Sequence, residues 1–114
     1  MNVKVFAKRK RLNDSLTDFL ISSVNYDSDS KEIISLCVMQ IYEKGGETFE
    51  IIKYDSAHGN CHVHRYYENP NDFSQLLPDN QINVKSFDEF KKDIKENWAE
   101  YKRRYFMKHF KQKL

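Results

Sequence analysis

Glycine, proline and cysteine are scarce in this 114-residue chain, which holds three, two and two of them. So few glycines and prolines leave no long flexible linker, and the length predicts a single α+β domain over residues 1–114. Two cysteines are too few for the disulfide framework of a small secreted protein. No apolar run approaches the roughly 20 residues that span a bilayer. We therefore expect a cytoplasmic protein with no membrane partner.

Aromatic residues are plentiful and compensate for a polar composition. They make up 14% of the chain, while hydrophobic residues of all kinds make up 39% and charged residues 32%. Each buried aromatic side chain removes about 150–250 Å² from water, so a short polar chain can still build a core. Disordered chains are poor in aromatics, so this composition predicts a folded protein.

Basic residues are concentrated at two ends that hold no acid. Residues 1–12 carry five bases and residues 102–114 carry six, whereas the residues between them hold all seventeen acids. Clustered Lys and Arg side chains release counterions when they bind phosphates, which favours RNA as a partner. The candidate nucleic-acid-binding residues are Lys8, Arg9, Lys10, Arg11, Arg103, Arg104 and Lys108. The alternative interpretation is that both ends are solvated and only keep the protein soluble.

Short apolar runs separated by turn signals predict a sheet in the first two thirds of the chain. Gly45-Gly46 between the runs 33–42 and 48–55 is typical of a tight β-hairpin. A third strand is expected at 61–67 and a short one at 2–12, with 68–80 as a polar loop. Residues 15–24 fit a helix by spacing and a strand by their β-branched end.

A long amphipathic helix is expected at the C-terminus. Ser86 followed by Glu89 is typical of a capping box, which would start the helix at Phe87. An apolar stripe at steps of three and four then continues through Phe87, Phe90, Ile94, Trp98, Tyr101 and Tyr105. We expect packing as far as Tyr101, with the basic end projecting, fraying or meeting a partner, and His109 either solvated or a partner of the helix dipole. The predicted fold is an antiparallel meander of three to five strands with this helix on one face.

Three of the four histidines fall within seven residues and form the candidate site. On a strand, side chains alternate between faces, so His62 and His64 share one face. Asp55 and His58 lie in or beside the preceding turn and can fold back toward them. We take Asp55, His58, His62 and His64 as the candidate catalytic residues.

Histidines near a carboxylate suit acid–base chemistry at neutral pH. One imidazole can accept a proton while another donates one, which is the requirement for metal-independent RNA cleavage. Candidate substrate-binding residues are Lys53, Tyr54, Arg65 and Tyr66, although strict alternation sends Arg65 to the opposite face.

Two other interpretations of the cluster stay open. Asp55, His58, His62 and His64 could instead bind a divalent transition metal, although no cofactor is otherwise indicated. Alternatively, the histidines are ordinary surface residues of a non-catalytic module that binds nucleic acid or protein. A homodimer is also compatible with the aromatic content.

The segment Lys53-Tyr54-Asp55-Ser56-Ala57-His58, followed by His62-Val63-His64, resembles the TumE-type toxins of type II toxin–antitoxin modules and related small uncharacterised proteins. The resemblance implies a small cytoplasmic toxin that acts on RNA and is held by a cognate antitoxin. It points to Tyr54, Asp55, His58, His62 and His64. We therefore predict a toxin-like ribonuclease that uses the histidine cluster.

Overall fold

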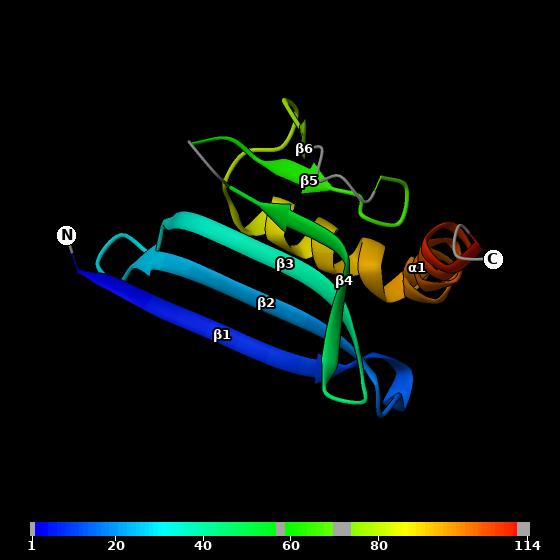
Figure 1. Ribbon diagram of the computed structural model, residues 1–114. Coiled ribbons are helices and arrows are strands. Elements are labelled where there is room, and N and C mark those ends of the chain that lie inside the picture. The colour runs from blue at the N-terminus through cyan, green and yellow to red at the C-terminus, as the bar shows by residue number, and fades with distance from the viewer. Residues whose placement is uncertain (1, 57–58, 70–73, 112–114) are drawn as a thin grey trace.

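A computed structural model describes residues 2–56, 59–69 and 74–111, and it forms one sheet and one long helix (Figure 1). In chain order the elements are β1 (Val3–Arg11), the 3-10 turn η1 (Leu12–Asp14), β2 (Asp18–Asp27), β3 (Ile33–Lys44), β4 (Glu47–Asp55), β5 (His62–His64), β6 (Ser74–Leu76) and α1 (Val84–Lys111). The α+β class with a C-terminal helix against an antiparallel sheet is confirmed.

The sheet is a six-stranded meander in which each strand pairs with the next one along the chain. The predicted hairpin joins β3 to β4, where Lys44 is paired with Glu47. Gly45 and Gly46 form its two-residue turn with φ angles of 61° and 80°. Positive φ at both positions is what this turn requires, and glycine adopts it without a steric penalty.

The ambiguous segment after η1 is a strand. Asp18, Leu20, Ser22 and Val24 of β2 are buried, and the residues between them are half-buried. This alternation with period two is that of a strand with one face in the core. The β-branched residues at the end of the segment therefore indicated its structure better than the helical spacing of its apolar residues did.

Helix α1 covers one face of the sheet, and its apolar stripe forms the core there (Figure 1). The Tyr54 and Phe90 rings stack with centroids 4.1 Å apart. Gln40 Nε2 donates to the Trp98 carbonyl oxygen at 2.9 Å. Ile94 is fully buried between these two contacts. We call this side the covered face and the other side of the sheet the open face.

The helix begins earlier than its capping signal predicts. Its first residue is Val84, and Asn83 Oδ1 accepts the backbone N–H of Ser86 at 2.9 Å. Asn83 therefore caps the helix, because its side chain satisfies an amide that has no partner within the first turn. Ser86 is 3% exposed and lies inside the first turn, so the predicted cap at Ser86 was wrong.

Packing also continues beyond Tyr101, contrary to the expectation that the helix end projects. The Phe106 ring meets the Tyr42 ring edge-on at 5.2 Å, and Tyr105 is buried. His109 stacks on Tyr105 at 3.8 Å, and its Nε2 lies 3.2 Å from the Tyr66 carbonyl oxygen. The expectation of a solvated His109 was therefore wrong.

The last strands differ most from the prediction. The expected strand over 61–67 is shortened to β5, and β6 lies within the segment expected to be a loop. Strand β4 bends near Ile51, which has no partner in β3 because Gln40 pairs with Ile52 and Ile41 with Glu50 (Figure 1). Such a bulge turns a strand, and here it directs the end of β4 toward β5.

Both cysteines are free thiols. Among the described residues, α1 is too polar to cross a membrane, and no other helix is long enough.

Candidate functional site

The candidate site lies where β4 and β5 pair. Lys53 is directly opposite His64, and Asp55 is directly opposite His62. Residues that face each other across an antiparallel pair point to the same side of the sheet. Tyr54, between Lys53 and Asp55, points into the covered face, where it stacks on Phe90. All four polar side chains therefore belong to the open face.

Asp55 is the centre of this group. Its Oδ2 lies 3.1 Å from His64 Nε2 and 3.9 Å from Lys53 Nζ. The imidazole of His64 is 14% exposed, so the contact is sheltered but open to solvent at one side. The contact between Asp55 Oδ2 and His64 Nε2 fixes the orientation of the His64 ring.

The second oxygen of Asp55 is buried without a hydrogen-bond partner among the residues that the structure describes. A buried carboxylate oxygen without a donor is costly, and such groups concentrate at functional sites. His62 is half-buried across from Asp55 and neighbours Leu76 of β6. The candidate catalytic residue His58 lies outside the described residues.

The structure separates two predicted substrate-binding residues from the cluster. Tyr54 is 7% exposed, and its hydroxyl donates to Asp93 Oδ2 at 2.6 Å. Burial, followed by the hydrogen bond to the Asp93 carboxylate, raises the pKa of Tyr54 well above its usual value. Arg65 donates to the Gln75 side chain beyond the end of β5. Tyr54 is thus a core residue rather than a surface phenol.

Tyr66, in contrast, lies beside the cluster as predicted. Its ring stacks on His64 with centroids 5.8 Å apart and planes inclined by 23°. The stack supports the orientation that Asp55 gives to the imidazole. Of the predicted substrate-binding residues, Lys53 and Tyr66 therefore lie with the histidines.

The metal interpretation receives no support from the part of the chain that is described. Within it, no three His, Cys, Asp or Glu side chains are placed to hold one ion. Asp55 and His64 are in contact through Oδ2 and Nε2, which is the geometry of a hydrogen bond between them.

The three C-terminal bases named as candidates have intramolecular partners. Arg103 pairs with Glu100 at 2.6 Å, and Arg104 pairs with Glu68 at 3.3 Å. Lys108 Nζ donates to the Glu68 carbonyl oxygen at 2.9 Å. These contacts lie at the surface, where each contributes little to stability, but they direct the cations back toward the protein.

The N-terminal bases divide into two groups. Arg9 forms a double hydrogen bond to Glu43 at 3.1 and 2.6 Å and lies 3.9 Å over the Phe19 ring. By strand register Arg9 and Arg11 point to the open face, whereas Lys8 and Lys10 point to the side of α1. Neither Lys8 nor Lys10 forms an ion pair with any described residue.

Lys91 and Lys95 were missed by the sequence reasoning. They lie on α1 at a spacing of four residues, so they share one face of the helix. Their positive charges act together with those of Lys8 and Lys10. The spacing was visible in the sequence, but the proximity of this helix face to β1 was not.

The architecture defines an α+β protein with a helix-covered sheet face and an open sheet face that carries the candidate cluster. The chain belongs to the family described as "Domain of unknown function (DUF7718)", whose model matches residues 7–111. No curated protein and no solved structure matches the chain.

Proposed function

We propose that this protein binds RNA on its open sheet face and cleaves it by acid–base catalysis without a metal. The observation that carries the proposal is the grouping of Lys53, Asp55, His62 and His64 on one face, with Asp55 in contact with His64. An extended strand of RNA suits such a surface, because an open sheet face can accommodate several nucleotides.

The chemistry is an attack of the ribose 2′-oxygen on the adjacent phosphorus. His62 takes the 2′-hydroxyl proton as the O2′–P bond forms and the P–O5′ bond breaks. His64, held by Asp55, delivers a proton to the departing 5′-oxygen. The products are a 2′,3′-cyclic phosphate and a 5′-hydroxyl. Two residues of one strand stand about 7 Å apart, which leaves room for a phosphate between the rings.

Lys53 supplies the positive charge for the phosphate. It is opposite His64 in the register, and its ammonium lies 3.9 Å from Asp55 Oδ2. A fixed cation near the phosphate stabilises the charge that develops on its non-bridging oxygens. The predicted role of Lys53 in substrate binding therefore remains part of the proposal.

The resemblance of the segment around Tyr54-Asp55 to TumE-type toxins favours RNA as the substrate and a cognate antitoxin as partner. Because Tyr54 is buried against Phe90, its part in that motif is packing of the strand that carries Asp55. Among the motif residues that the structure describes, Lys53, Asp55, His62 and His64 lie on the open face.

The test is cleavage of a single-stranded RNA of mixed sequence in the presence of EDTA. We expect 2′,3′-cyclic phosphate ends from RNA and no cleavage of the same sequence with 2′-O-methyl riboses. His62→Ala and His64→Ala should each lower the rate at least about 100-fold.

The matched control is His109→Phe, which removes an imidazole but keeps a ring to stack on Tyr105. It should cleave at the wild-type rate. Absence of cleavage by the folded wild-type protein, or an unchanged rate in both histidine variants, would overturn the proposal.

A further inference from the structure

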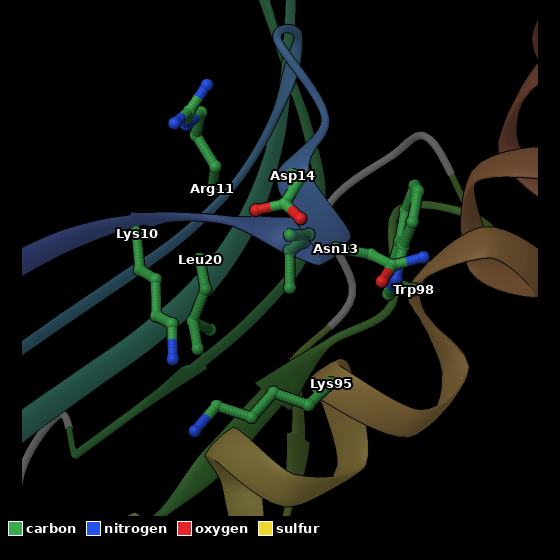
Figure 2. A pocket seen from close by; sticks show the side chains of 8 residues that line it. Lys10, Arg11, Asn13, Asp14, Leu20, Lys95 and Trp98 are labelled. Atoms are coloured by element: carbon green, nitrogen blue, oxygen red, sulfur yellow. The ribbon is translucent and has the colours of Figure 1, made fainter.

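A second cationic region lies on the other side of the sheet, between the edge strand β1 and helix α1. A groove of about 550 Å³ opens there, lined by Lys10, Arg11, Leu12, Asn13, Asp14, Leu20, Lys95 and Trp98. Figure 2 shows the side chains of Lys10 and Lys95 extending from strand and helix into the space between them, whereas Arg11 turns away. The groove thus joins the basic N-terminal strand to the middle of the helix.

Like charges are brought together at this groove. Lys95 is exposed, and slight desolvation, followed by the positive charges of three other lysines, lowers its pKa. These three are Lys10, Lys91 and Lys8. Among the described residues, no carboxylate forms an ion pair with Lys8, Lys10 or Lys95, whereas Lys91 pairs with Asp88 at 3.3 Å. Folding therefore creates repulsion that a bound anion would relieve.

The groove also presents an aromatic surface. Trp98 is the single tryptophan of the chain and is half-buried in the groove wall. Gln40 binds its carbonyl oxygen and so fixes the backbone that carries the indole. Stacking of a base on such a ring contributes about 1–3 kcal/mol.

The other polar residues of the groove favour binding of a nucleic-acid base over binding of an acidic peptide. Asp14 is the acidic side chain of the lining, and Asn13 lies next to it (Figure 2). A carboxylate accepts hydrogen bonds from the amino groups of bases but repels the side chains of an acidic peptide. The groove therefore offers cations that can bind phosphates. It also offers an indole and hydrogen-bonding groups that can bind a base.

We propose that the groove between β1 and α1 binds single-stranded nucleic acid, with a phosphate at Lys10 and Lys95 and a base on Trp98. The site is separate from Asp55, His62 and His64 and does not depend on their chemistry. A strand held here would cross the β1 edge, where Lys8 adds a further cation.

Fluorescence of the lone tryptophan measures occupancy directly. The probe is an eight-nucleotide 2′-O-methyl RNA, which the proposed cleavage reaction cannot consume. We expect saturable quenching of Trp98 emission and affinity about tenfold weaker in Lys10→Gln and in Lys95→Gln. Each substitution should also reduce the slope of log affinity against log salt by about 0.7.

Lys92→Gln is the matched control, because Lys92 lies on the same helix, is 75% exposed and does not line the groove. It should bind like the wild type. Lys95→Gln should at the same time keep or raise the melting temperature, since it removes repulsion. Weaker binding without loss of stability separates a binding role from a structural one.

Several results would overturn the proposal. One is the absence of quenching by the oligonucleotide, and another is equal affinity of Lys95→Gln and Lys92→Gln for it. A third is equal quenching by a poly-glutamate peptide, because that result would indicate a protein-binding site. If His64→Ala still shows quenching, or if the wild type shows quenching but cleaves no RNA, the groove proposal is supported. Failure of the cleavage proposal would therefore not affect it.

Discussion

Asp93 on the covered face and Asp55 on the open face have different kinds of partner. On the covered face, Asp93 accepts hydrogen bonds from the Tyr54 and Tyr101 hydroxyls at 2.6 and 2.7 Å, and from the Asn97 amide at 3.0 Å. On the open face, Asp55 meets an imidazole and an ammonium, and its other oxygen has no partner among the described residues. Asp93, surrounded by hydroxyl and amide donors, holds the helix against the sheet, whereas Asp55, beside an imidazole and an ammonium, is the carboxylate of the proposed reaction.

Strand β4 supplies both faces from adjacent residues. Tyr54 extends to the helix and Asp55 to the histidines, because side chains alternate along a strand. Stability should therefore depend on the covered face and activity on the open face. The following substitutions test that division, from the largest expected effect on stability to the smallest.

Ile94→Ala should have the largest effect. Ile94 is fully buried at the centre of the covered face. Truncation leaves a cavity that the neighbouring elements fill only partly, so the free energy of unfolding should fall by about 3 kcal/mol. Urea denaturation followed by circular dichroism measures the change. A loss below about 1 kcal/mol would mean that the helix is not packed as described.

Lys102→Ala should cost less but still a measurable amount. Lys102 Nζ lies 3.1 Å from Asp18 Oδ2, and the Asp18 side chain is 3% exposed. Without its cation the buried carboxylate keeps only the Ser15 and Thr17 hydroxyls, so we expect a loss of about 2 kcal/mol in denaturant unfolding. Arg103→Ala, which removes the exposed pair with Glu100 and a surface contact with the Met107 sulfur, is the control and should change stability by less than about 0.5 kcal/mol.

The tyrosines of the covered face should make the protein sensitive to alkali. Burial, followed by the hydrogen bond to Asp93, raises the pKa of both Tyr54 and Tyr101. In the unfolded chain tyrosine loses its proton near pH 10, whereas the folded state retains it. The stabilisation is therefore complete below about pH 10 and is lost as the pH rises further.

Tyr54→Phe tests this dependence. It should lower stability by about 1 kcal/mol at pH 7, because Asp93 loses one of its donors. The decline in melting temperature above pH 10 should also become shallower than in the wild type. Equal slopes for the two proteins between pH 9 and 11 would contradict the role given to Tyr54.

His62→Ala should have the smallest effect on stability. His62 is half-buried on the open face, and its side chain forms no hydrogen bond with a described residue. We expect a change of about 0.5 kcal/mol or less in thermal or denaturant unfolding. A loss as large as that of Ile94→Ala would show that the open face is part of the core, and would remove the contrast between the two faces.

The sequence predicted the elements with strong local signals. The Gly45-Gly46 hairpin and the apolar stripe of α1 are encoded in neighbouring residues, and both are confirmed. Strand β6 was missed because Ser74–Leu76 is short and fully exposed, so it carries no apolar alternation. The helix start was misplaced because Ser86 has the side chain of a cap but is buried by the preceding loop.

Side-chain partners were less predictable than elements. Alternation placed His62 and His64 on one face, but it also separated Tyr54 from Asp55, which the motif had grouped together. Charge counts could not distinguish Arg103, which is paired with Glu100, from Lys10, which forms no ion pair among the described residues. Those differences depend on how helix and sheet are docked, which short-range sequence patterns do not encode.

Nuclear magnetic resonance with a non-cleavable RNA is the most direct test of the claim that the covered face stabilises the fold and the open face binds RNA. Adding a 2′-O-methyl oligonucleotide to the labelled protein should shift the resonances of Asp55, His62 and His64, in addition to those of the groove residues Lys95 and Trp98, and leave those of the buried Tyr105 in place. Unchanged resonances at all three open-face residues under saturating RNA would contradict the account.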